Sequence, residues 1–266
     1  MPLQRKRIRP VHTPVTVYEQ PLSERLRFFL RLECLFGQTR HCLRSESGQD
    51  SHTCLGNLLE ILHVIGRVDI KTEAVKELER IIATLEPLAQ TPGVNHNTLD
   101  SLLVTLGGLK SHLRNMDGPI AQELRDNEFF KLLLQRSGIP GGLCDFDLPP
   151  YRHWLQRNAE TRIADLRNWY GCLDTLRLSV DLILKLIRES ATPVNCIAEG
   201  GIYQQSLDSA SPFQLIRVTL PENSLYFVEI SGGRHRFTVR LLQASTGERA
   251  LQATEDVTFQ LSCCAL

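Results

Sequence analysis

The sequence predicts an α+β protein, in which an N-terminal all-helical domain is followed by a small antiparallel β-sheet or sandwich. Up to residue 192, apolar residues recur at intervals of three and four, the period of a helix with one buried face. Across residues 193–266, apolar and polar residues alternate in short runs bounded by glycine-containing turns, which is typical of antiparallel strands. The 266 residues suffice for one large domain or two modest ones.

The helical domain is expected over residues 21–192, with Pro21 in the first turn of its first helix, where a missing N–H does no harm. Further helices are expected in CLGNLLEILHVI, KTEAVKELERIIATLEPLAQ, NTLDSLLVTLGGLKSHL, IAQELRDNEFFKLLLQR and PPYRHWLQR. The last and clearest helix, CLDTLRLSVDLILKLIRES, carries an apolar seam at alternating threes and fours: Leu173, Leu176, Val180, Ile183 and Ile187. Such a seam requires a partner helix, either inside the fold or in another subunit.

The β-domain is expected over residues 193–266, with strands in FQLIRVTL, SLYFVEI, RHRFTVRLLQ and DVTFQLSC. Residues 231–233, Ser-Gly-Gly, are predicted to form a three-residue hairpin loop between two of them. Residues 11–20 also alternate, and we expect this N-terminal strand to join the β-domain. Residues 1–10 are basic and are expected to form a disordered tail.

Composition excludes several classes of protein. The chain has 30 basic and 30 acidic residues and a pI of about 7.1, so no broad attraction to nucleic acid or anionic lipid is indicated. No apolar run approaches the roughly 20 residues that span a bilayer, so no membrane insertion is expected. The 8 cysteines lie largely in apolar periodic segments, which indicates buried thiols in a reducing cytoplasm.

No catalytic motif is found. G-x-S-x-G, the P-loop and H-E-x-x-H are absent, and the cysteines and histidines have no zinc-binding spacing. We therefore expect no enzymatic activity, no cofactor and no metal. The pair Asp145 and Asp147 could serve acid–base chemistry, but the favoured interpretation is that Asp147 caps the next helix.

A short arginine-rich strand is the candidate binding element. Alternation puts Arg234, Arg236, Thr238 and Arg240 on one face, and His235, Phe237, Val239 and Leu241 on the other. Arg217, on an expected neighbouring strand, would add a further cation. Arg236 and Arg240 are about 13 Å apart at a rise of about 3.4 Å per residue, which suits carboxylates along a short peptide. The alternative interpretation is a solvated outer strand face.

Five segments resemble the ZapD family of FtsZ-binding bacterial cell division proteins: VTVYEQPLSERLRFFLRLECLF, VKELER, IPGGLCDFDLPPYRHWL, ISGGRHRFTVRLL and FQLSCC, in this order. The resemblance runs from about Val15 to Cys264. It implies a cytoplasmic homodimer without catalytic activity, located at the mid-cell division site. It further implies binding to the acidic and apolar C-terminal tail of FtsZ, with two sites per dimer that cross-link and bundle FtsZ filaments and so stabilise the Z ring.

The resemblance also implies a basic tail-binding site where the two domains meet. The two strand arginines of the family match Arg236 and Arg240, and a third basic position falls on Arg152, with His153 beside it. At a fourth basic position this chain has Glu128, with Lys131 one turn on. Together with the strand analysis, the expected tail-binding residues are Arg236, Arg240, Arg152, His153, Arg234, Lys131 and Arg217.

A nucleic-acid-binding module is the alternative function. It would use the basic strand together with the N-terminal RKRIR segment. The zero net charge and the few aromatic residues on that strand argue against this alternative.

Overall fold

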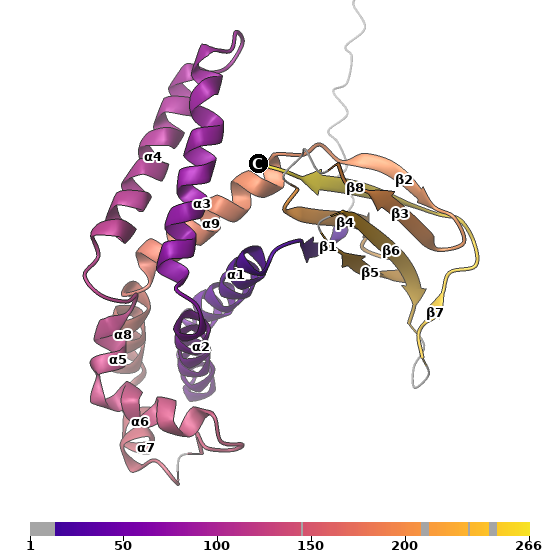
Figure 1. Cartoon of the computed structure of the whole chain (residues 1–266). Helices are drawn as coiled ribbons and strands as arrows, with labels where there is room; N and C mark the ends of the chain where they lie inside the picture. The colour runs from indigo at the N-terminus through magenta and orange to yellow at the C-terminus, as the bar shows by residue number, and fades with distance from the viewer. Residues whose placement is uncertain (1–13, 145, 209–212, 234, 245–248) are drawn as a thin grey trace, which may run out of the picture. The chain divides into compact units, whose positions relative to one another are not determined.

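The chain folds as two units, a helical unit and a β-unit (Figure 1). The structure is a computed structural model and describes residues 14–144, 146–208, 213–233, 235–244 and 249–266. Glu24–Leu186 form the helical unit, and residues 14–23 together with the described part of Ile187–Leu266 form the β-unit. The predicted α+β fold class is confirmed.

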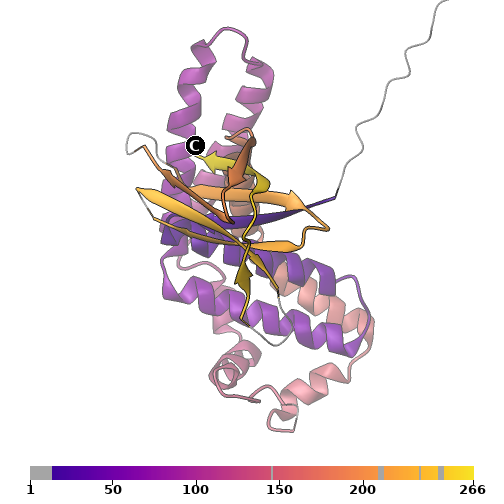
Figure 2. The ribbon, with the colours of Figure 1, turned by 90° about the vertical axis from the view of Figure 1, so that its right-hand side faces the viewer.

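The helical unit is built from consecutive helices joined by short connections. Their bounds are α1 (Glu24–Cys42), α2 (Gly48–Arg67), α3 (Ile70–Leu85), the 3₁₀ helix η1 (Glu86–Gln90), α4 (His96–Asn115), α5 (Gln122–Asp126), α6 (Glu128–Ser137), α7 (Pro149–Leu155), α8 (Ala159–Gly171) and α9 (Asp174–Glu189). Side chains that accept a hydrogen bond from the first turn cap five of them: Ser47, Asp69, Asn95, Asn127 and Asn158. The helices α3 and α4 form a long hairpin in both views (Figures 1 and 2).

The apolar seam of α9 is buried inside the fold, which decides between the two partners considered for it. Leu173, Leu176, Val180 and Ile183 are at most 1% exposed. The polar side of the same helix is tied to α1, because Arg40 Nη1 lies 3.5 Å from Asp181 Oδ2. A seam that is already covered within one copy offers no surface to another subunit.

Two details at helix starts differ from the expectation. Pro21 is the last residue of strand β1 rather than part of a first helical turn, and α1 begins at Glu24. Asp147 does not cap α7: the capping residue is Leu148, no side-chain cap bond is made, and prolines occupy the first positions. Proline needs no hydrogen-bond partner for its nitrogen, so a side-chain cap is less needed there. Asp145 lies outside the described residues.

The described strands of the β-unit form two antiparallel sheets. Their bounds are β1 (Val15–Pro21), β2 (Val194–Ala198), β3 (Ile202–Ser206), β4 (Leu215–Pro221), β5 (Tyr226–Gly232), β6 (Arg236–Gln243), β7 (Leu251–Gln252) and β8 (Val257–Cys264). One sheet has the order β1-β4-β8-β2 and the other β3-β6-β5, with β7 added beside β6. The N-terminal strand β1 pairs with β4, from Val15 opposite Pro221 to Pro21 opposite Leu215. The strands β2 and β3 were not predicted.

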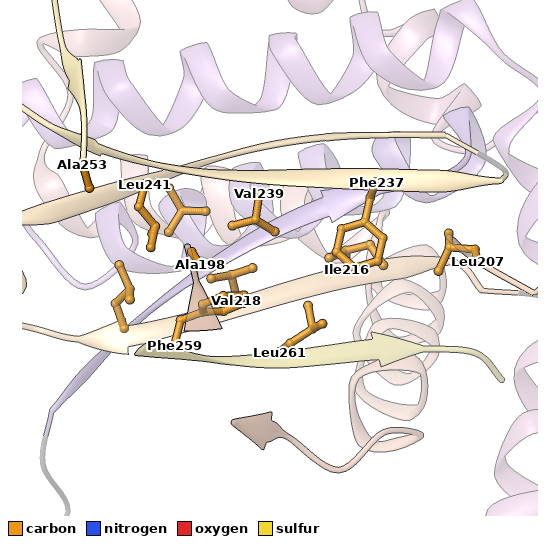
Figure 3. Close-up of a cluster of buried hydrophobic side chains, with 12 residues drawn as sticks. Ala198, Leu207, Ile216, Val218, Phe237, Val239, Leu241, Ala253, Phe259 and Leu261 are labelled. Carbon is orange, nitrogen blue, oxygen red and sulfur yellow. The ribbon is translucent and has the colours of Figure 1, made fainter. Parts of the chain in front are cut away.

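A shared apolar core makes the two sheets a sandwich. Phe237, Val239 and Leu241 of β6 point toward Ile216 and Val218 of β4, as Figure 3 shows. The complete cluster contains Ala198, Leu207, Ile216, Val218, Leu220, Val228, Phe237, Val239, Leu241, Ala253, Phe259 and Leu261. Because alternate residues enter this core, the residues between them must face outward.

Glu19 joins three elements of the β-unit. Its carboxylate accepts bonds from Arg188 at the end of α9, at 2.8 Å and 2.7 Å, and from Arg217 on β4, at 2.9 Å. The Glu19 side chain is 18% exposed, so these charge-assisted bonds are partly shielded from water. The cluster anchors β1 at the edge of its sheet.

We expect Glu19→Ala to destabilise the β-unit by about 1–3 kcal/mol, because two partly buried guanidinium groups would lose their carboxylate. Hydrogen exchange of the β1 and β4 amides, read by mass spectrometry, measures the effect. The matched control is Glu222→Ala, at an exposed position of the same unit, which should change stability by less than about 0.5 kcal/mol. Equal exchange in the two variants would contradict a stabilising role.

A second prediction concerns acid stability of the helical unit. A hydrogen bond from Arg25, Nε to Oε2 at 2.5 Å, holds the pKa of Glu73 below its usual range. Such a group stabilises the fold above its unfolded-state pKa of about 4.3, and this stabilisation is lost as pH falls through the folded-state pKa. Glu73→Gln should therefore flatten the loss of unfolding free energy between about pH 5 and about pH 3. Urea titrations at both pH values test this, with exposed Glu60→Gln as control; an unchanged pH slope in Glu73→Gln would refute it.

Candidate functional site

The outward face of β6 carries the strand arginines. Arg236 and Arg240 are exposed and Thr238 lies half-buried between them, whereas Phe237 and Val239 are at most 1% exposed. The predicted alternation is thus confirmed from residue 236 to residue 241. Arg234, also expected on this face, lies outside the described residues.

His235 was expected on the core side, and this prediction is wrong. His235 is exposed and precedes the first residue of β6, Arg236. The last pair of the β5–β6 hairpin is Gly232 with Phe237, so the strand alternation does not extend back to His235. Gly233 N–H donates a hydrogen bond to the Arg236 carbonyl at 3.0 Å.

The register of the sheet places an acidic residue on one side of Arg240 and an apolar residue on the other. Glu229 of β5 is directly opposite on one side and Ile202 of β3 on the other. Arg240 Nη1 lies 3.5 Å from Glu229 Oε2, and the two side chains are 44% and 56% exposed. An ion pair this open to water is weak. Glu229 nevertheless offsets the charge of Arg240.

Arg236 has a different environment. It makes no ion pair with any residue in the described part of the chain, and Ser206 of β3 is its cross-strand neighbour. A hollow of 460 Å³ adjoins it. The hollow is lined by Gln204, Ser231, Gly232, Gly233, His235, Arg236, Phe237 and Thr238. Hydroxyl, amide and cationic groups therefore gather at this end of β6, with no acidic residue among the described lining.

Arg217 does not belong to this face, which corrects the expectation that its strand neighbours β6. It lies on β4, in the other sheet, between the core residues Ile216 and Val218. Its side chain therefore points away from the core on the opposite side of the sandwich, where it binds Glu19 at 2.9 Å. Arg217 is a structural residue of the β-unit.

Within the helical unit, an aromatic cluster fixes the position of α7. The rings of Tyr151 and Trp154 are stacked with centroids 6.2 Å apart. The ring centroid of Trp154 lies 5.9 Å from that of Phe129 of α6 and 5.6 Å from that of Trp169 of α8. The indole Nε1 of Trp154 also donates a hydrogen bond to Asp165 at 3.0 Å. Such contacts hold a short helix that could not be stable alone.

The basic residues expected in the helical unit are exposed on these fixed helices. Arg152 and His153 point outward from α7 while their neighbours Tyr151 and Trp154 are buried. Lys131 on α6 is exposed, and its ammonium group binds Glu128 at 2.8 Å. This hydrogen bond raises the pKa of Lys131. Glu128 therefore offsets part of the positive charge that Lys131 supplies.

Three residues beside the arginines were not identified from the sequence: Glu229, Gln204 and Ser231. The hairpin register is the signal that could have found Glu229. A loop at residues 231–233 would have paired Glu229 with His235, whereas the observed register pairs it with Arg240. Gln204 lies on β3, a strand that the sequence pattern did not reveal.

Among the described residues, no group of three or more His, Cys, Asp or Glu is arranged to hold a metal ion. No helix in the described ranges has the length and hydropathy needed to cross a membrane.

Comparison with known proteins gives one consistent result. The model of the ZapD family, described as cell division protein, matches residues 30–240. The chain is 41% identical to the cell division protein ZapD of Methylococcus capsulatus, over 94% of this chain and 98% of the relative. It is 39% identical to that of Coxiella burnetii, over 96% and 100%, and 36% identical to that of Aromatoleum aromaticum, over 95% and 98%.

Proposed function

Because the chain belongs to the ZapD family of cell division proteins, we propose that it binds the C-terminal tail of FtsZ through the arginine face of β6. We further propose that it acts as a cytoplasmic homodimer at mid-cell, which cross-links and bundles FtsZ filaments and so stabilises the Z ring. The observation that carries the proposal is the pair Arg236 and Arg240, both exposed on one outward strand face over a closed core.

A rigid strand suits the capture of an acidic peptide. Arg240 lies four positions after Arg236 along the strand, so their Cα atoms are about 13 Å apart. Because Phe237, Val239 and Leu241 are held in the core, the backbone that carries the arginines is ordered before the peptide arrives. A guanidinium group can bond both oxygens of one carboxylate, which makes arginine better suited than lysine to this task.

A single site is expected to bind only modestly, since a short flexible peptide loses conformational entropy when it is ordered. FtsZ polymers present many tails. Two sites in one homodimer then gain from effective concentration, by about 10²–10⁴ over a single site. Bundling follows from this bivalency without a chemical step.

The exposed basic residues of the helical unit are proposed as a second group of contacts. Arg152 and His153 are held on α7 by the aromatic cluster, and Lys131 lies on α6 beside Glu128. Arg234 remains a proposed contact on the β6 side. Arg217 is left out, because Glu19 already occupies it.

The nucleic-acid-binding alternative has less support. Glu229 lies beside Arg240, and a carboxylate at that position would repel a phosphate backbone. The N-terminal basic segment lies outside the described residues. A gel-shift assay separates the two functions, since the proposed FtsZ-binding protein should retard neither DNA nor RNA at physiological salt.

We expect the double variant Arg236→Glu with Arg240→Glu to lose at least about 30-fold in affinity for the FtsZ tail peptide, because attraction becomes repulsion at both positions. Fluorescence anisotropy of a labelled peptide measures this. The matched control is Arg249→Glu, an exposed arginine of the same unit off strand β6, which should retain wild-type affinity. Circular dichroism verifies that the fold is kept; wild-type affinity in the folded double variant would rule the proposal out.

Bundling should weaken as salt rises, since exposed ion pairs are screened over a Debye length of about 8 Å at physiological ionic strength. Sedimentation of FtsZ polymers with the protein across a salt series tests this. FtsZ alone at each salt concentration is the control for polymer formation. Bundling that does not change with salt would argue against an electrostatic contact.

A further inference from the structure

We propose that the two strand arginines play different parts: the hollow beside Arg236 is the carboxylate subsite, and Glu229 restrains Arg240. In this arrangement one carboxylate of an acidic peptide enters the hollow and is held by Arg236 with Thr238, Ser231 and Gln204. Arg240 makes a weaker, secondary contact. The inference deepens the proposed function and rests on it for the identity of the peptide.

The hollow offers the groups that a carboxylate needs. An ionised carboxylate only accepts hydrogen bonds, so its site must supply donors. Thr238 of β6 is directly opposite Gln204 of β3 on one side and Ser231 of β5 on the other, so the three form one row of an amide and two hydroxyl groups. Each neighbour has its Cβ atom about 4.5–5.5 Å from that of Thr238, close enough for Thr238 and a neighbour to bind one ligand together. All three line the hollow.

Arg236 supplies the charge at the same place. It lines the hollow, and no residue in the described ranges forms an ion pair with it. His235 also lines the hollow and adds an imidazole group. The hollow, of 460 Å³, is open at the surface. A carboxylate side chain with part of its backbone therefore fits, and the guanidinium group does not have to leave another partner first.

The next row of residues across the sheet combines an apolar, a basic and an acidic side chain. In this row Arg240 is directly opposite Ile202 of β3 on one side and Glu229 of β5 on the other. None of these three lines the hollow. An incoming carboxylate at Arg240 would compete with Glu229, whose Oε2 is 3.5 Å from Arg240 Nη1, and would be repelled by it.

The inference predicts that replacing Arg236 weakens peptide binding and that replacing Glu229 strengthens it. Arg236→Gln should weaken peptide binding by about 10-fold or more, and Arg240→Gln by only about 2–3-fold. Glu229→Gln should tighten binding by about 3-fold, because it frees Arg240 and removes a repulsive charge. Thr238→Val, which keeps the shape and removes the hydroxyl, should weaken binding by about 3–5-fold.

The experiment uses the full chain, the four single variants and two probes. One probe is the FtsZ C-terminal tail peptide, followed by fluorescence anisotropy. The other is the acetylated and amidated tripeptide Asp-Glu-Asp, followed by shifts of backbone amide resonances in ¹⁵N-labelled protein. With the tripeptide we expect the largest shifts at Gln204, Ser231 and Thr238, and their loss in Arg236→Gln. Arg249→Gln serves as the matched control, and circular dichroism verifies folding.

The outcomes separate the subsite from the proposed function. If the tail peptide binds but Arg236→Gln and Arg240→Gln lose equally, or Glu229→Gln binds no better, the subsite is wrong while FtsZ binding stands. If the tail peptide does not bind but the tripeptide shifts the Gln204–Thr238–Ser231 row, the carboxylate subsite stands and FtsZ is not the ligand. If the tail peptide does not bind and the tripeptide shifts no resonance of this row, both are overturned.

Discussion

Burial of one side of strand β6 is the constraint on which the candidate site depends. Phe237, Val239 and Leu241 close the core between the two sheets of the sandwich (Figure 3). Burial of each of these side chains stabilises the fold by roughly 1.5–3 kcal/mol. The strand cannot rotate or slip by one residue without exposing all three. Arg236 and Arg240 are therefore held outward by residues that never contact a ligand.

Charge is distributed locally in a chain whose formal net charge is zero. Most arginines with defined partners stabilise the fold: Arg25 binds Glu73, and Arg188 and Arg217 share Glu19. Arg236, like Arg249, has no carboxylate partner among the described residues, and it differs from Arg249 because it lines a hollow with hydroxyl and amide groups. A guanidinium group without a carboxylate partner in the fold can bind a carboxylate of another molecule without first breaking an ion pair. This difference between structural and available arginines could not be inferred from their number in the sequence.

Much of the fold was predictable because side-chain period is a local property. The helical periodicity up to residue 192 and the alternation of Phe237, Val239 and Leu241 predicted the fold class and the outward direction of Arg236 and Arg240. The family resemblance is confirmed by the matches to ZapD proteins. The pairing of strands was not predictable in the same way, because the alternation of apolar and polar residues does not indicate which sheet a strand joins. Arg217 was misplaced for that reason, and Glu229 was missed because a hairpin register depends on the turn.

The central claim is that the outward face of β6 binds the tail of FtsZ, and a crystal structure of the chain with the FtsZ C-terminal tail peptide tests it most directly. The account predicts a peptide carboxylate within hydrogen-bonding distance of the Arg236 guanidinium, with the peptide following β6 toward Arg240. A peptide bound elsewhere, for example on the outward face of the sheet that contains Arg217, with Arg236 still facing solvent, would contradict it.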